Sequence, residues 1–224
     1  MEQAAYEAAQ AAGLDLVETA DGLTLTDGTM CLRADFSRML PRIKQGRLQH
    51  ELLVRASKLK GTVAPVAVDA TAGFGEDSLL LAAAGFTVEL FERDAVIAAL
   101  LADALERAAN DPTLSGAVAR MHFHAGDSLA GMADLAAAGA RVDVVYLDPM
   151  FPGRTKSAAV KKKFQLLHHL ERPCDDEVEL LQAARALSPR KIVIKRPVKG
   201  PVLAGAKPSY QLAGKAVRYD VLAS

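Results

Sequence analysis

From residue 61 onward, short β-rich runs alternate with longer stretches of helical periodicity, and this alternation limits the possible folds more than any other feature. The runs expected to be strands are 66–69, 88–92, 118–124, 142–147 and 191–195. The stretches expected to be helices are 76–84, 94–109 and 128–138, with one or two more between 157 and 187. Such an alternation predicts an α/β fold with a parallel sheet between helices. Residues 210–213 and 216–222 flank Gly214-Lys215 and predict a C-terminal antiparallel hairpin, which brings the sheet to seven strands.

The first 60 residues follow a different pattern. Residues 1–12 are rich in alanine and predict a helix, whereas residues 14–36 alternate apolar and polar side chains. Asp21-Gly22 and Asp27-Gly28 are hairpin turn signals within that second stretch, so we expect a small antiparallel meander there. Helical spacing over 48–59, ending near Gly61, predicts one more helix. We therefore divide the chain into a β-rich N-terminal extension, 1–60, which we expect to recognise the substrate, and a main domain, 61–224.

Charge and cysteine content exclude several classes of protein. The 27 Lys and Arg residues equal the 27 Asp and Glu residues, so any nucleic-acid site must be a local patch. Cys31 and Cys174 are too few for a disulfide framework or a four-cysteine zinc site, and free thiols fit a reducing cytoplasm. The apolar stretch 79–91 contains Glu89 and is shorter than a membrane span. We expect a cytoplasmic protein without a membrane partner.

Acidic residues follow four successive predicted strands, at the end of the sheet where an open α/β fold binds its ligand. They are Asp69, Glu92, Asp127 and Asp148. Each has an ordinary structural explanation, since Asp127 with Ser128 can cap a helix and Asp148 before Pro149 can form a turn. Gly73 and Gly75, after the first strand, either shape a turn or let a ligand approach the backbone. All of these together predict a ligand site, in which Glu92 accepts two ribose hydroxyls.

Several segments resemble class I S-adenosylmethionine (SAM)-dependent methyltransferases, and more narrowly the family of ribosomal RNA small subunit methyltransferase J. The segments are D-A-T-A-G-F-G-E-D (69–77), L-F-E-R (90–93), V-V-Y-L-D-P-M-F-P (144–152), K-S-A-A-V-K-K (156–162) and V-I-K-R-P (193–197). The resemblance covers about 61–224 and implies a Rossmann-like fold. It also implies methyl transfer from SAM, with S-adenosylhomocysteine as product, to N2 of a guanosine in 16S ribosomal RNA.

The same resemblance assigns site residues. The cofactor would be bound by Gly73, Glu76, Asp77, Glu92, Arg93, Asp127, Ser128 and Asp148. Glu76 stands where the family pattern has a basic residue, so a contact to the cofactor carboxylate would run through the backbone. The catalytic residues would be Asp148 and Pro149, which accept hydrogen bonds from the guanine amine, and Phe151, which stacks on a flipped base unless it is a core phenylalanine.

Basic residues after this loop and after the fifth strand are expected to contact RNA phosphates, although a lysine run is more often a solvated helix face. They are Lys156, Lys161, Lys162, Lys195 and Arg196. The partner would be small-subunit ribosomal RNA or the 30S subunit, and we expect a monomer. We expect no metal, because His122 and His124 share a strand face without further ligands at suitable spacing.

Three other functions stay open on sequence grounds. The substrate of a methyltransferase could instead be tRNA, large-subunit ribosomal RNA, DNA or a protein amide. The fold could instead serve a nicotinamide-dependent oxidoreductase, although Ser78 breaks the G-x-G-x-x-G pattern of such enzymes. A non-catalytic RNA-binding protein is the third alternative, and the intact Asp148–Phe151 loop argues against it.

Overall fold

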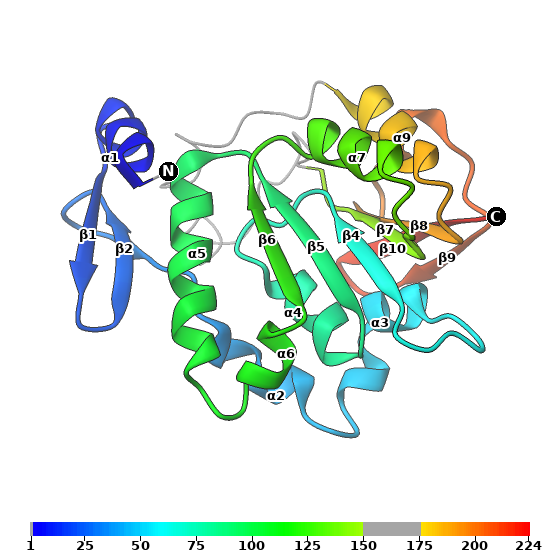
Figure 1. Cartoon of the computed structure of the whole chain (residues 1–224), viewed down its shortest axis with the longest axis horizontal. Helices are drawn as coiled ribbons and strands as arrows, with labels where there is room; N and C mark the ends of the chain where they lie inside the picture. The colour runs from blue at the N-terminus through cyan, green and yellow to red at the C-terminus, as the bar shows by residue number, and fades with distance from the viewer. Residues whose placement is uncertain (1, 150–175) are drawn as a thin grey trace.

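The structure is a computed structural model that describes residues 2–149 and 176–224. Within these residues, a mostly parallel seven-stranded sheet has the order β6-β5-β4-β7-β8-β10-β9 (Figure 1). Its strands are β4 (Val66–Asp69), β5 (Thr87–Glu92), β6 (Met121–Ala125), β7 (Val144–Leu147), β8 (Lys191–Pro197), β9 (Tyr210–Ala213) and β10 (Val217–Ala223). The first five strands pair in parallel, and β10 pairs antiparallel with both β8 and β9. The expected sheet with its C-terminal hairpin is confirmed.

The strand order reverses beside β4. The chain passes from β4 outward to β5 and β6, and then returns to the other side of β4 as β7. In open α/β sheets, ligands bind outside the carboxyl ends of the strands at such a reversal. This reversal determines where a ligand site can form.

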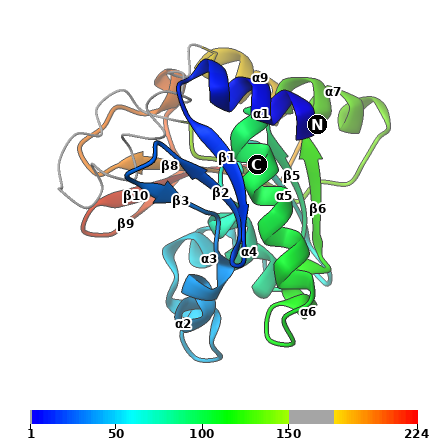
Figure 2. The same ribbon diagram turned by 90° about the vertical axis from the view of Figure 1, so that its left-hand side faces the viewer.

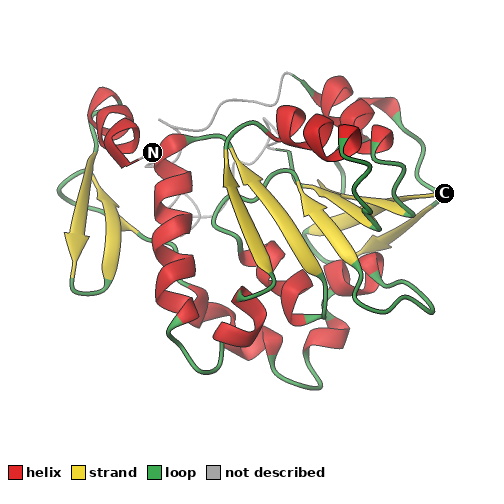
Figure 3. Ribbon diagram, viewed as in Figure 1, coloured by secondary structure: helices red, strands yellow, loops and turns green. Residues whose placement is uncertain are grey.

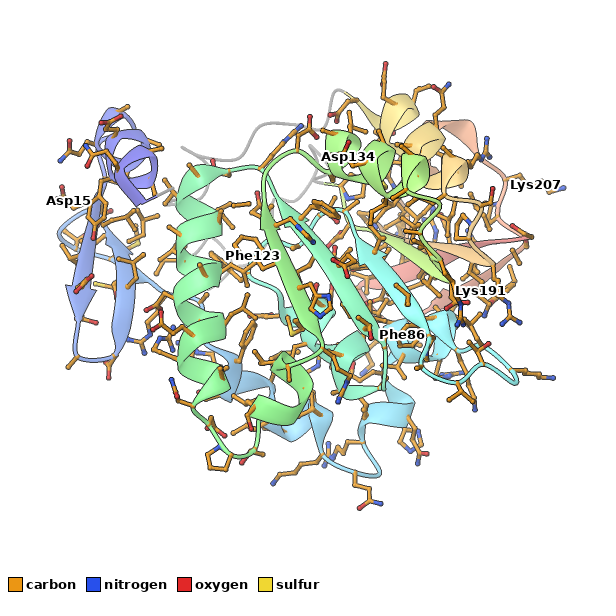
Figure 4. All side chains as sticks on the ribbon, in the orientation of Figure 1. Asp15, Phe86, Phe123, Asp134, Lys191 and Lys207 are labelled. Carbon is orange, nitrogen blue, oxygen red and sulfur yellow. The ribbon has the colours of Figure 1, made fainter. Side chains whose placement is uncertain are left out.

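Helices cover both faces of the sheet (Figure 3). They are α4 (Glu76–Ala83), α5 (Ala95–Ala109), α6 (Ser115–Val118), α7 (Ser128–Ala137) and α9 (Glu177–Ala186). Successive residues of β7 divide between two core clusters, because strand side chains alternate in direction. Tyr146 packs in the cluster that contains α4 and α5, and Leu147 packs in the cluster that contains α7 and α9. Charged side chains such as Asp134 and Lys207 point outward (Figure 4).

The N-terminal residues form a helix and a small antiparallel sheet that lie along α5 (Figure 2). The elements are α1 (Glu2–Ala11), β1 (Asp15–Thr19), β2 (Gly22–Thr26) and β3 (Cys31–Leu32). Ala5, Leu25 and Phe36 are buried in the same core cluster as the helices α4 and α5. The expected meander is therefore present. Its apolar side chains pack against the helices that cover one face of the main sheet.

Two expected elements differ most from the structure. The run 118–124 was expected to be a strand, but Val118 ends α6 and the strand begins at Met121. Leu114, Ala117 and Val118 are buried at helical spacing, so packing on a helix outweighs the β preference of valine. The stretch 48–59 is divided into the short 3-10 helix η2 (Leu48–His50) and α3 (Leu52–Ser57), because Glu51 has an extended backbone.

The structure contains three short elements that the sequence analysis did not predict. Two lie between the meander and η2, the 3-10 helix η1 (Phe36–Met39) and the short helix α2 (Leu40–Ile43). The third is a 3-10 helix, η3 (Leu203–Gly205), that precedes β9. Of the helices expected between 157 and 187, α9 is described and the remainder lies outside the described residues. In the described part of the chain, no helix is long and apolar enough to cross a membrane.

Candidate active site

The four acidic residues that the sequence places after successive strands lie at one edge of the sheet. Asp69 is the last residue of β4, and Glu92 is the last residue of β5. Asp127 follows β6 by two residues, and Asp148 follows β7 directly. Because these strands are parallel, their carboxyl ends meet at the edge where the strand order reverses.

The two glycines after β4 have different surroundings. Both have positive φ angles, 55° at Gly73 and 73° at Gly75, which favour glycine. A Cβ atom on Gly73 would meet no atom of the described residues within 4 Å. A Cβ atom on Gly75 would lie 2.7 Å from Leu101 and 3.1 Å from Phe36. Gly73 therefore faces open space that a ligand can use, whereas Gly75 is required by packing against α5 and the N-terminal extension.

Glu92 lies beside Gly73. Its carboxylate accepts hydrogen bonds from the backbone N–H groups of Gly73, at 2.9 Å, and Asp94, at 2.8 Å. Burial raises the pKa of Glu92 above its ordinary value, and these two bonds act in the opposite direction. An ionised carboxylate offers about four acceptor positions, so two bonds leave room for hydroxyl donors. The arrangement suits a ligand that carries neighbouring hydroxyl groups.

Asp69 supports the loop from the inside. It is fully buried, and it accepts hydrogen bonds from the Ser78 hydroxyl, at 2.6 Å, and from the Thr71 backbone N–H, at 3.0 Å. Burial raises the pKa of Asp69 to about 7, against the effect of these two bonds. Its role is to connect the end of β4 to both sides of the glycine-containing turn.

The other residues expected to bind the cofactor lie around the same edge. Asp127 caps α7 by accepting a hydrogen bond from the Leu129 N–H at 2.9 Å, and the next residue, Ser128, is buried. Glu76 is the first residue of α4. The half-exposed Arg93 forms an ion pair with Asp176 at 3.1 Å. The capping bond uses one oxygen of Asp127, so the structural and ligand-binding interpretations of this residue are compatible.

Lys195 connects two carboxylates in front of β7. Its Nζ atom lies 2.7 Å from the Asp77 carboxylate and 2.9 Å from that of Asp148. Asp77 also accepts a hydrogen bond of 2.6 Å from the Tyr146 hydroxyl. We call these four residues, Tyr146, Asp77, Lys195 and Asp148, the lysine network. It fixes the position of the Asp148 carboxylate from the side of β8.

Burial and charge act in opposite directions within the lysine network. Burial alone would lower the pKa of Lys195, but the Asp77 and Asp148 carboxylates raise it well above its ordinary value. Burial alone would raise the pKa of Asp77, but the Lys195 ammonium outweighs it and lowers this pKa. The lysine is therefore charged at neutral pH, and Asp77 is ionised opposite it.

Thr71 joins the two halves of the site. Its hydroxyl accepts a hydrogen bond of 2.7 Å from the Asp148 backbone N–H, while its own N–H binds Asp69. The loop after β4 and the loop after β7 are thus held together by one side chain. Asp148 is fixed through its backbone by Thr71 and through its carboxylate by Lys195.

The residues expected to contact RNA have separate positions. Lys195 belongs to the lysine network, with 17% of its side chain exposed. Arg196 is almost fully buried, donates to the Pro201 carbonyl and pairs with Glu177 at 3.1 Å, so a phosphate contact would require it to leave the core. Phe151, Lys156, Lys161 and Lys162 lie outside the described residues, and Pro149 is the last described residue before them.

The two histidines of β6 bind one carboxylate. His122 Nδ1 and His124 Nε2 lie 2.8 and 2.7 Å from the two oxygens of Glu89 on the neighbouring strand. His124 also stacks on Phe91, with ring centroids 4.7 Å apart. Among the described residues, no group of three or more His, Cys, Asp or Glu side chains is arranged to hold a metal ion.

Sequence reasoning missed Tyr146 and Thr71 and assigned Lys195 a different role. The order of the strands contains a signal for the pairing of Lys195 with Asp148. The parallel register pairs Leu147 of β7 with Ile194 of β8, so the next residues, Asp148 and Lys195, face each other. Tyr146 precedes Asp148 by two residues and therefore shares its face of the strand.

Comparison with known proteins identifies the family of the chain. A family model described as "Putative SAM-dependent methyltransferase" matches residues 1–224. The chain is 44% identical to a Ribosomal RNA small subunit methyltransferase J of Thioalkalivibrio sulfidiphilus, over 96% of this chain and 87% of the relative. It is 46% identical to a protein of the same name from Pseudomonas aeruginosa, over 80% of this chain and 68% of the relative.

Solved structures show the same fold. The crystal structure of a SAM-dependent methyltransferase from Neisseria gonorrhoeae matches with a TM-score of 0.75 and 34% identity, and covers 93% of this chain and 81% of that one. An rRNA methyltransferase from Streptomyces viridochromogenes matches with a TM-score of 0.51 and 18% identity, over 79% of this chain and 84% of that one. The second likeness concerns the fold alone.

Proposed function

The chain belongs to the SAM-dependent methyltransferase family that includes ribosomal RNA small subunit methyltransferase J, and on this premise we propose that it methylates N2 of a guanosine in small-subunit ribosomal RNA. The observation that carries the proposal is the Asp148 carboxylate, held by Lys195 at the strand-order reversal. We also propose that the protein acts in the cytoplasm, as a monomer and without a metal.

The cofactor half of the proposal rests on the open space at Gly73 and the acceptor positions of Glu92. The ribose hydroxyls would bind Glu92, and the adenine would lie towards Asp127 and Ser128. SAM, when bound, supplies an electrophilic methyl group on a sulfonium. The Asp148 carboxylate contributes negative charge near the place where that cation would lie, which favours its binding.

The chemical half of the proposal rests on Asp148. The exocyclic amine of guanine is a weak nucleophile because its lone pair is delocalised into the ring. A carboxylate that accepts an N–H of this amine favours the form with an available lone pair, and it stabilises the positive charge that develops on nitrogen. Lys195 would act as a positioning residue that keeps Asp148 ionised and correctly directed. The Pro149 carbonyl would accept the second N–H.

Residues outside the described part of the chain complete the proposal. Phe151 would stack on the flipped guanine, in a contact that is worth about 1–3 kcal/mol in comparable complexes. Lys156, Lys161 and Lys162 would contact phosphates of the RNA. Family membership supports this function over a nicotinamide-dependent oxidoreductase, whereas tRNA and large-subunit RNA are substrates that an experiment must separate.

The test compares ribosomal RNA from cells with and without the protein. Nucleosides methylated on guanine N2 are mapped by mass spectrometry in small-subunit RNA, large-subunit RNA and tRNA. In cells without the protein, we expect one guanosine of small-subunit RNA to lack its N2 methyl group. Purified protein with SAM should restore this methyl group in small subunits from those cells. Loss of a methyl group from tRNA or large-subunit RNA instead would overturn the proposed substrate. Unchanged methylation in all three RNAs would overturn the proposed activity on RNA.

A further inference from the structure

A cavity of about 540 Å³ lies between the N-terminal extension and the antiparallel end of the main sheet. One wall comes from the segment that contains α2, η2 and α3, and the other from β10. Its lining includes Arg42, Arg47, His50, Glu51, Leu52 and Tyr219. The volume lies within the range of small-molecule sites and is sufficient for a nucleotide.

The segment that forms the first wall carries a local excess of positive charge. Residues 36–60 contain seven Lys and Arg residues and one acidic residue, Glu51, in a chain whose net charge is zero. Glu51 is already bound by Arg42 through two hydrogen bonds of 3.0 and 2.7 Å, so its charge is compensated. Arg47 is exposed at the cavity and forms no ion pair with the residues of 2–149 and 176–224. An anionic group entering the cavity would therefore meet an available guanidinium.

Tyr219 lines this cavity and is also a neighbour of the lysine network. It pairs in register with Lys195 across the β8–β10 ladder, and Lys195 contacts Asp148. Strand order places Glu92 on one side of Asp148 and Tyr219 on the other. β10 lies two strands from β7, about 10 Å away. The cavity is therefore next to the proposed methyl-transfer position and opposite the proposed cofactor position.

We propose that this cavity binds a nucleotide of the RNA strand beside the target guanosine, with its phosphate against Arg47. The Arg42–Glu51 pair holds the rim in place, and Leu52 and Tyr219 provide an apolar wall for the ribose or base. This inference rests on the proposed function and names the surface that receives the substrate strand. It assigns to α2–α3 and β10 a role in substrate binding that is separate from binding of the cofactor.

The test compares Arg47→Glu with Arg55→Glu. Both arginines are exposed on the same segment, but Arg55 does not line the cavity. Methyl transfer to under-methylated small subunits is measured at several salt concentrations, and SAM affinity is measured by calorimetry. Arg47→Glu is expected to raise the KM for RNA about tenfold, the effect of one lost charge-assisted contact, and to reduce the slope of log affinity against log salt by about one. Arg55→Glu is expected to change both values much less.

Each outcome decides the inference. Unchanged RNA affinity in Arg47→Glu would overturn it, as would equal losses in the two variants, since these would indicate a general effect of charge. A loss of SAM affinity in Arg47→Glu would also overturn it, because the cavity would then support the cofactor loop. If the wild-type protein binds SAM but transfers no methyl group to small subunits, the proposed function itself fails. That failure is visible before any variant is compared.

Discussion

The β4–β5 half and the β7–β8 half of the sheet edge hold their carboxylates by different means. In the first half, backbone N–H groups of the adjacent loops bind Glu92 and Asp69. In the second half, Lys195 of β8 binds Asp148, and it also reaches across to Asp77 in the first turn of α4. Backbone donors leave acceptor positions open and suit the binding of a neutral hydroxyl. A fixed cation sets the charge and direction of one carboxylate, as a catalytic group requires. The comparison therefore predicts that the β4–β5 half binds the cofactor and that the β7–β8 half acts in methyl transfer.

The largest effect should come from Asp148→Ala. If this carboxylate stabilises charge that develops on the guanine nitrogen, kcat should fall by about 10²–10³. The measurement is single-turnover methyl transfer to under-methylated small subunits, with Asp134→Ala, an exposed aspartate of α7, as control. If a folded Asp148→Ala protein transferred methyl groups at the wild-type rate, the proposed role of the β7–β8 half in methyl transfer would be wrong.

Lys195→Met should have the next largest effect. The substitution leaves two carboxylates without their shared cation, and we expect kcat to fall by about 10–100-fold, as it does when the hydrogen-bond partners of metal ligands are removed. Without the ammonium the pKa of Asp148 should rise, so the acid limb of the kcat profile should move to higher pH. Lys195→Arg should recover part of the rate. A purely structural role would lower stability in Lys195→Met without moving the pH profile, and Lys199→Met, an exposed neighbour, serves as control.

Glu92→Ala tests the other half. Loss of the acceptor for the ribose hydroxyls should weaken SAM binding by about 1–3 kcal/mol, measured by calorimetry. At saturating SAM, kcat should stay close to the wild-type value, because Glu92 is remote from the proposed reacting amine. Glu106→Ala, on the exposed face of α5, is the control. If Glu92→Ala lowered kcat as strongly as Asp148→Ala, the division between binding and turnover would be wrong.

Asp69→Asn should have the smallest effect on activity and a distinct effect on stability. In the folded protein the pKa of Asp69 is about 7, above its ordinary 3.8. Between these values the folded state holds a proton that the unfolded state has released, so this group lowers the free energy of unfolding as pH rises through the window. Asparagine does not ionise. The stability of the variant relative to the wild type should therefore increase from pH 5 to pH 8 by about 1 kcal/mol or more in urea denaturation.

The sheet, its helix layers and the acidic edge could be predicted because they are encoded locally. Strand and helix periods are visible within ten residues, and each acid directly follows its own strand. Gly73 and Gly75 look equivalent in sequence, yet one faces open space and the other packs on Leu101 and Phe36. That difference depends on residues far away in the chain, so no local pattern contains it.

The role of Lys195 could not be predicted from its neighbours for the same reason. In the sequence it stands beside Arg196 and looks like half of a basic pair that could bind RNA. In the structure the two side chains point to opposite faces of β8, one towards Asp148 and the other into the core beside Glu177. Only the register between β7 and β8 decides which of the two residues meets the carboxylate.

The contact of Phe36 with Gly75 links ligand occupancy to the opening of the N-terminal extension. Any fluctuation that withdraws Phe36 removes support from the glycine turn, so the opened form should bind SAM poorly. A ligand that binds the closed form alone lowers the population of the opened form. At a concentration of one hundred times its Kd, the ligand stabilises the closed form relative to the opened form by about 2.7 kcal/mol. Amide hydrogens of residues 36–39 should consequently exchange more slowly with solvent deuterium when SAM is present.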